Sequence, residues 1–199
     1  MSHFWFSKQP VAASRPDLAQ WNQTFMQGGY YRVDLSPKIS ILALNTLTFN
    51  VKTLGQNADP ANATLQLDWL EQALNSSEPD RRFILTFHIY AGTQVWNNSK
   101  GLWDQWNANY TSRFSQIIRD NHEKVILEVA GHDHVGDLRY SDQKYAPEDE
   151  KKGKNFSFHN IIIAPSITLT SESLPGYTVF KLDDETQIAR DLKMVFFPV

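Results

Sequence analysis

The residues best suited to chemistry are four consecutive ones, Gly131, His132, Asp133 and His134. They follow a short apolar run, residues 125–130, with the composition of a buried strand. Histidine is the commonest metal ligand in proteins because a neutral ring nitrogen is available near pH 7. Open α/β sheets place their ligands at the carboxyl ends of strands. The motif therefore predicts a metal site at a strand end, if a third ligand lies elsewhere in the chain.

A third histidine, His88, also follows an apolar segment, residues 83–87. By itself it would more often be a packed histidine bonded to a backbone carbonyl, but the Gly-His-Asp-His motif favours a ligand. Two parallel strands that both end in histidine would bring His88, His132 and His134 to one edge of a sheet. Three imidazoles without thiolates suit zinc, iron, manganese or nickel. We expect these three residues to bind the metal.

A hydrolytic centre also needs carboxylates that hold and bridge two cations about 4 Å apart. Asp133 and Asp137 are the nearest acidic residues in the sequence. In an extended stretch, Asp133 would point to the opposite side from the histidines that flank it. We therefore expect Asp133 to support the ligands or shape the loop, and not to bind metal itself.

Apolar periodicity predicts the elements that must position these residues. The predicted strands cover residues 39–45, 82–88, 124–130, 161–163, 177–182 and about 187–197, and the predicted helices cover 63–75 and 106–121. A glycine–tyrosine turn at residues 28–31 should enter a further strand, and residues 50–62, 90–104 and 140–154 should be loops. Strands alternating with helices predict an α/β fold with a mixed sheet, and the absence of a linker or repeat predicts one domain over residues 1–199.

Bulk composition narrows the classes of partner. The chain has 199 residues, 41% of them hydrophobic, and a net charge of −3, which is typical of a globular domain. Its basic cluster, residues 151–154, directly follows the acidic residues 148–150, so a solvated loop is expected and not a nucleic-acid surface. No apolar run reaches the 18 residues of a membrane span, and the N-terminus does not resemble a signal peptide.

Cysteine is absent, which excludes disulfides and thiolate ligands. Asn-x-Ser/Thr sequons, in contrast, are more frequent than composition alone would give. They begin at Asn22, Asn62, Asn75, Asn97, Asn109 and Asn155. The excess predicts a glycosylated protein of the secretory pathway, located outside the cell or in a lysosome-like compartment.

Aromatic residues flank the predicted site in the sequence, namely Tyr90, Trp96, Trp103 and Trp106. Such a cluster could hold a choline-like cation by cation–π contact. Packing under a long loop is the more common role for aromatic residues in this setting, and it is the interpretation we favour.

Six segments resemble those of one family, in the same order, from about residue 21 to residue 184. These are the glycine–tyrosine turn with the "LNT" strand (28–31 and 41–46), the Trp-Leu helix (67–71), the "HIPPG" loop (87–92), "GHTH" (131–134), "PSVT" (164–168) and "NPGY" (175–177). The chain thus resembles the calcineurin-like metallophosphoesterases and, within them, the acid sphingomyelinase-like phosphodiesterases.

The resemblance implies a mixed-sheet sandwich flanked by helices, with α/β/β/α layers. It implies that His88 and His132 bind one cation of a two-metal centre and that His134 binds the other, with zinc as the usual metal. It further implies that a metal-activated hydroxide attacks the phosphorus of a phosphodiester substrate.

The chain also departs from the family pattern. Residues 1–87 contain no Asp-x-His, Gly-Asp or Gly-Asn-His motif, which supply the bridging carboxylate and further ligands in the family. Tyr90 and Ala91 replace the two prolines of "HIPPG", and Leu174 stands where the family often has asparagine. The sequence therefore resembles the C-terminal half of the catalytic domain.

Two functional hypotheses follow from this pattern. In the first, the chain is part of a metal-dependent phosphodiesterase whose missing half lies upstream or is supplied by a second polypeptide. In the second, it is a non-catalytic, glycosylated binding or assembly subunit derived from the same fold. The absence of the bridging aspartate motivates the second hypothesis.

Overall fold

The computed structural model describes residues 18–52, 59–94, 103–140, 160–169, 173–183 and 185–198. In chain order, its elements are α2 (Leu18–Gly28), β1 (Tyr31–Asp34), β2 (Ile39–Leu44), the 3-10 helix η1 (Thr46–Phe49), α3 (Pro60–Asn75), β3 (Arg82–Phe87), β4 (Thr93–Gln94), β5 (Trp103–Asp104), α4 (Ala108–Asp120), β6 (Val125–Ala130), β7 (Asp137–Tyr140), β8 (Asn160–Ile163), β9 (Gly176–Leu182) and β10 (Ala189–Phe196). The alternation of strands and helices confirms the predicted α/β class.

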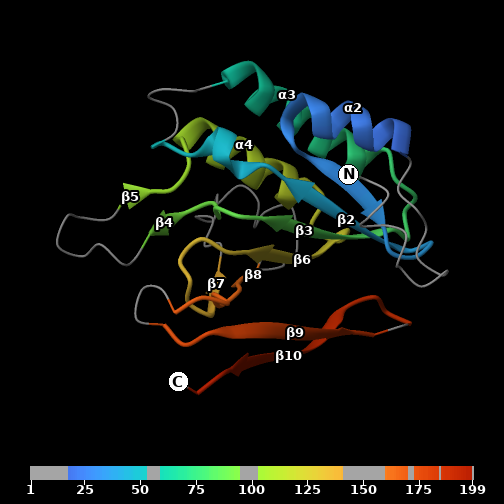
Figure 1. Cartoon of the computed structure of the whole chain (residues 1–199). Coiled ribbons are helices and arrows are strands. Elements are labelled where there is room, and N and C mark those ends of the chain that lie inside the picture. The colour runs from blue at the N-terminus through green and yellow to red at the C-terminus, as the bar shows by residue number, and fades with distance from the viewer. Residues whose placement is uncertain are drawn as a thin grey trace, which may run out of the picture.

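A six-stranded sheet, with the order β1-β2-β3-β6-β8-β7, forms the centre of the molecule (Figure 1). Its four inner strands, β2, β3, β6 and β8, are parallel to one another. The edge strands β1 and β7 pair antiparallel to β2 and β8. The predicted mixed sheet is therefore confirmed. Strands β3 and β6, which precede the histidines, are parallel neighbours, as the site prediction requires.

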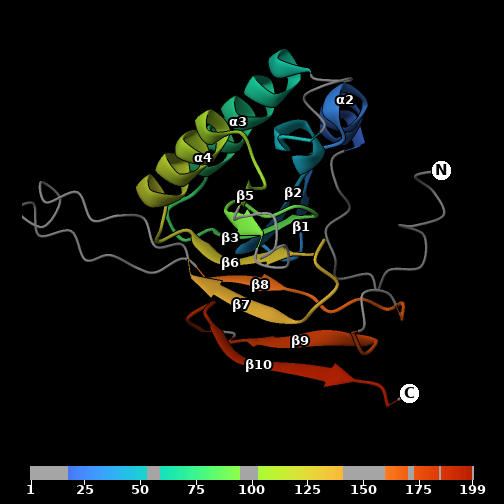
Figure 2. The ribbon, with the colours of Figure 1, turned by 90° about the vertical axis from the view of Figure 1, so that its left-hand side faces the viewer.

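The sheet lies between two layers (Figures 1 and 2). Helices α2, α3 and α4 cover one face, and the antiparallel hairpin of β9 and β10 lies against the other. On the helical side, Leu67, Leu70 and Leu74 are almost fully buried, as their helical spacing predicts. On the hairpin side, Phe180 and Met194 pack against a smaller cluster of isoleucine and leucine side chains from the sheet. The arrangement matches an α/β sandwich flanked by helices.

Capping residues set the starts of the two predicted helices. Helix α3 begins three residues earlier than expected, at Pro60, because the Asp59 side chain accepts a hydrogen bond from the backbone of Asn62. Helix α4 begins two residues later, at Ala108, where Asn107 caps it. Trp106, expected inside this helix, is extended and forms an isolated bridge with Asn50. Local hydrogen bonds thus overrode the apolar pattern at both boundaries.

Some elements escaped the sequence reasoning. Helix α2 was missed although Trp21 and Phe25 lie four residues apart, as residues on one helical face do. The two rings pack against each other and against Tyr31 of β1. Strand β7 consists mainly of polar residues and exists through its pairing with β8. The expected loop at 90–104 contains the short ribbon of β4 and β5. The polar loop expected at 140–154 lies outside the described residues, apart from Tyr140, which ends β7.

No helix within the described ranges has both the length and the apolar character needed to cross a bilayer. The single domain over residues 1–199 stays a prediction.

Candidate metal centre

The structure brings His88 and His132 together at the carboxyl ends of β3 and β6. The Nδ1 atom of His132 and the Nε2 atom of His88 are 3.4 Å apart, and the two ring centroids are separated by 5.1 Å. The backbone N–H of Gly131 donates a hydrogen bond of 3.0 Å to the carbonyl of His88. This bond extends the pairing of β3 and β6 beyond the last residues of the two strands. His88 and His132 therefore lie at the same edge of the sheet.

Two long-range hydrogen bonds fix the backbone that follows His88. The N–H of Ile89 donates to the hydroxyl of Thr46 at 2.9 Å, and its carbonyl accepts from the indole nitrogen of Trp106 at 3.0 Å. Both bonds are buried, so each is costly to leave unmade. The His88 side chain itself is exposed. A rigid, buried anchor therefore presents an imidazole that solvent and ligands can reach.

The loop that carries the other two histidines has an uncommon backbone conformation. His132 has a φ of 83° and His134 a φ of 61°, both in the left-handed region that disfavours residues other than glycine. Such conformations persist where the surrounding structure over-determines them, and they cluster at functional sites. Asp133 lies between these two residues, and its side chain is bonded to residues from other parts of the fold.

Asp133 is buried, and its carboxylate accepts three hydrogen bonds. The donors are the hydroxyl of Tyr90 at 2.6 Å, the side-chain amide of Gln94 at 3.2 Å and the guanidinium of Arg139 at 3.2 Å. With a side chain only 1% exposed, Asp133 is committed to these partners. These contacts agree with a loop-shaping role for Asp133, whereas its support of metal ligands stays a prediction.

Arg139 completes the network from β7. Its guanidinium also pairs with Asp137 at 2.9 Å, donates to the backbone carbonyl of Thr93 at 2.8 Å, and lies 4.4 Å from the centroid of the Tyr90 ring. Burial, followed by the hydrogen bond to Asp133, raises the pKa of Tyr90 well above its usual value. The phenol therefore remains a hydrogen-bond donor at any physiological pH.

His134 lies on the other side of Asp133 and anchors a different segment. Its carbonyl accepts hydrogen bonds from the backbone N–H of Ser166 at 3.3 Å and from the hydroxyl of Ser173 at 2.7 Å. The segment that resembles "PSVT" is thereby joined to the histidine loop. Within the described residues, however, no three His, Cys, Asp or Glu side chains are placed to hold one metal ion together. The three-histidine set stays a prediction, and the close contact is between His88 and His132.

The electrostatics of His132 favour a neutral ring. Burial lowers the pKa of His132, and the nearby His88 lowers it further. A neutral imidazole is the form that coordinates metal ions. At neutral pH the ring can therefore offer a nitrogen lone pair without first losing a proton.

The spacing of the two ring nitrogens fits a shared cation. Two nitrogens that each lie about 2.05 Å from one tetrahedral zinc ion are separated by about 3.3 Å. The observed separation between His132 Nδ1 and His88 Nε2 is 3.4 Å. The same contact is also a ring-to-ring hydrogen bond whose donor is set by the tautomers, so the use of this pair as two donors to a divalent metal stays a prediction.

The aromatic residues near the site are mainly packing residues. Trp106 is fully buried among core aromatic rings, including Phe49 and Phe114. Tyr90 is also fully buried, and Arg139 is the cation over its ring. The favoured packing interpretation is confirmed for these two. Trp103 lies in β5, and Trp96 lies outside the described residues.

The sequons differ in their structural setting. Asn22, Asn75 and Asn109 are exposed. Asn62 is half-buried, and its side-chain nitrogen, the atom that would carry a glycan, donates to the carbonyl of Gln27 at 3.1 Å. Asn97 and Asn155 lie outside the described residues. Glycosylation remains a prediction, and the structure favours the three exposed positions.

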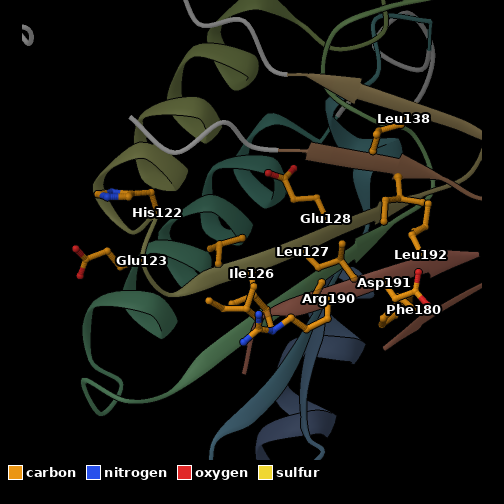
Figure 3. A pocket seen from close by; sticks show the side chains of 14 residues that line it. His122, Glu123, Ile126, Leu127, Glu128, Leu138, Phe180, Arg190, Asp191 and Leu192 are labelled. Carbon is orange, nitrogen blue, oxygen red and sulfur yellow. The ribbon is translucent and has the colours of Figure 1, made fainter. Parts of the chain in front are cut away.

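A separate cavity of about 490 Å³ lies between β6 and β8 of the central sheet and the β9–β10 hairpin (Figure 3). Its wall is largely apolar, with Leu127, Phe180 and Leu192 among the lining residues. Glu128 and Arg190 occupy different parts of this wall. None of the three predicted histidine ligands lines it, so this cavity is distinct from the candidate metal centre.

No family model matches the chain. The chain is similar to a protein named sphingomyelinase phosphodiesterase D from Dictyostelium discoideum, with 24% identity over 187 residues. The match covers 91% of this chain but 41% of that protein, so the chain spans less than half the length of this curated relative. The match agrees with the phosphodiesterase-like resemblance that the motifs carry.

Among solved structures, the chain is similar to GAP50, the anchor in the inner membrane complex of Plasmodium. The TM-score is 0.43 and the identity 11%, over 73% of this chain and 44% of that one. A likeness of this size supports no functional conclusion.

Sequence reasoning missed the residues that hold the two histidine loops in place. Thr46, Tyr90, Gln94 and Arg139 all bond to these loops or to Asp133. Tyr90 could have been identified from the sequence, because it replaces a proline in the "HIPPG" segment and places a phenol two residues from the predicted ligand His88. Gln94 and Arg139 offered none, since their contacts depend on the fold.

Proposed function

We propose that this chain is part of the catalytic domain of a metal-dependent phosphodiesterase of the sphingomyelinase-like kind. The observation that carries the proposal is the 3.4 Å separation of the ring nitrogens of His88 and His132 at adjacent strand ends. The name of the Dictyostelium relative supports the reaction class. The six sequons support a protein that is secreted or resides in a lysosome-like compartment.

In this proposal, His88 and His132 hold one divalent cation, zinc by preference, and His134 contributes to a second. A bound cation would supply Lewis-acid polarisation of the phosphoryl oxygens and lower the pKa of its bound water. The protein contributes two neutral nitrogen donors on rigid strand ends, together with a loop whose backbone is fixed by Asp133. The bridging carboxylates would come from the rest of a longer protein or from a second polypeptide.

Zinc titration of the purified chain, followed by calorimetry, tests the metal site. We expect binding that weakens at least tenfold in His88→Gln and in His132→Gln. His122→Gln is the matched control, because His122 bonds to the Arg119 carbonyl at the end of α4 and belongs to no predicted site. Equal affinity in all three variants, or no zinc binding by the wild-type chain, would reject the metal site.

Hydrolysis of a chromogenic phosphodiester separates the two functional hypotheses. The chain combined with the missing half of the domain should hydrolyse the diester in a zinc-dependent manner. Zinc binding without any hydrolysis in that complete assembly would favour the non-catalytic binding or assembly subunit instead.

A further inference from the structure

We propose that Tyr90 and Arg139 act through Asp133 as positioning residues that hold His132 against His88. The metal-binding use of this geometry rests on the proposed function, but the positioning itself rests on contacts within the chain. The three side chains come from three places in the fold, namely the segment after β3, the loop after β6, and strand β7. Their contacts join the two histidine loops a second time, beyond the backbone bond between Gly131 and His88.

Tyr90 is the fixed end of this connection. It is fully buried, and it directly follows Ile89, whose backbone is held by Thr46 and Trp106. Its hydroxyl therefore has little freedom to follow a loop that moves. A hydrogen bond of 2.6 Å to a buried carboxylate is short and charge-assisted, and belongs to the stronger class of such bonds.

Asp133 links Tyr90 to the loop of residues 131–134, which has the uncommon backbone conformation. The residues on either side of it, His132 and His134, are the ones with positive φ. A left-handed conformation at such residues needs an outside constraint to persist. The bonds from Tyr90, Gln94 and Arg139 to the carboxylate supply it, because the loop cannot relax without pulling Asp133 from its donors.

The network is a matched set that neither residue could form alone. Tyr90 stands where the resembled "HIPPG" segment has proline, and Asp133 stands where "GHTH" has threonine. A buried carboxylate without the phenol would lack a donor, and a buried phenol without the carboxylate would lack this acceptor. Each of the two departures from the family motifs therefore supplies the hydrogen-bond partner that the other needs. Together they form a support for the imidazole pair in this chain.

The consequence for metal binding is pre-organisation. Residues that orient metal ligands from behind typically contribute 10–100-fold to metal affinity. Without the network, the loop would be free to leave the left-handed conformation, and His132 would no longer be held within 3.4 Å of His88. We therefore expect metal affinity to fall because the two rings are no longer held together, although both histidines are still present.

Tyr90→Phe tests this inference, because it removes one hydroxyl and leaves the ring. Tyr30→Phe is the matched control, since Tyr30 is also buried and its hydroxyl donates to Gln27 at 3.2 Å. The first readout is the nuclear Overhauser effect between the ring protons of His88 and His132 without metal. The second is the zinc dissociation constant. Tyr90→Phe should weaken the ring contact and raise the dissociation constant about 10–100-fold, whereas Tyr30→Phe should change neither.

Asp133→Asn provides a second variant if Tyr90→Phe does not fold. The amide still accepts a bond from Tyr90 but lacks the charge that pairs with Arg139, so an effect of intermediate size is expected. An unchanged ring contact and zinc affinity in the folded variants would overturn the inference. If the wild-type chain binds no zinc, the proposed function fails, and the ring contact alone still decides whether the network positions His132.

Discussion

The hydroxyl of Tyr90 donates a hydrogen bond of 2.6 Å to the carboxylate of Asp133, which lies 43 residues further along the chain. This contact joins the segments that follow the parallel strands β3 and β6. Each of these segments carries one histidine of the close pair. A single buried bond therefore couples the stability of the fold to the geometry of the candidate metal centre.

This coupling should be measurable as a free energy of unfolding. Tyr90→Phe leaves Asp133 with one donor fewer and should destabilise the protein by about 1–3 kcal/mol. In a double-mutant cycle with Asp133→Asn, the two changes should be non-additive by about 0.5–3 kcal/mol, because Asp133→Asn removes the charge from the acceptor of the same bond that Tyr90→Phe deletes. Urea denaturation of the four proteins measures this cycle. Strict additivity would show that the bond contributes nothing specific to stability.

Glu128 should make stability depend on pH. It lies in the middle of β6, paired with Leu85 and Ile161 on either side, and burial raises its pKa from 4.5 to about 8. Below pH 4.5 the carboxyl is protonated in both states. As pH rises towards 8, the unfolded state ionises while the folded state keeps its proton, so stability falls.

Glu128→Gln should abolish this loss. Relative to the wild type, the variant should gain stability on the order of 3 kcal/mol at pH 7 and much less near pH 5. Urea unfolding of both proteins at pH 5, 6.5 and 8 tests the prediction. Parallel stability curves over that range would mean that Glu128 does not titrate as its burial implies.

Trp106 should link the aromatic core to the His88 segment. Trp106→Ala should cost about 3–5 kcal/mol of stability through loss of buried volume. Trp106→Phe keeps most of the ring but leaves the Ile89 carbonyl without its indole donor, and should cost about 1–3 kcal/mol. Denaturation measures both costs, with Phe114→Leu as a core control that removes no hydrogen bond. A phenylalanine variant as stable as the wild type would show that the indole bond is dispensable.

The sequons should be occupied unequally when the protein is made in a eukaryotic secretory host. Glycopeptide mapping should find sugars at the exposed Asn22, Asn75 and Asn109. Asn62 should be largely unmodified, because its side-chain nitrogen is bonded to the Gln27 carbonyl and the residue is half-buried. Full occupancy of Asn62 together with empty exposed sites would contradict this ordering.

The sequence alone determined the features that depend on local periodicity. The leucine spacing in α3 predicted that helix, because burial of one helical face imposes a 3.6-residue period. The nearly continuous apolar runs of β2, β3 and β6 predicted strands, because parallel strands inside a sheet are buried on both faces. Since His88 and His132 each follow such a strand, the sequence also predicted that they would meet. Strand β7 escaped prediction, because its residues are mainly polar and its pairing with β8 decides its existence. Helix α2 was missed although Trp21 and Phe25 have the spacing of one helical face.

Only the tertiary structure decided how the histidines are held. The partners of Asp133 lie 43, 39 and 6 residues away, in Tyr90, Gln94 and Arg139, and no local pattern connects them. The left-handed backbone of His132 and His134 is likewise maintained by these distant contacts, against the local preference of the chain. Residue types and strand ends therefore determined which imidazoles converge, whereas side chains brought together by the sheet determined the geometry in which they do so.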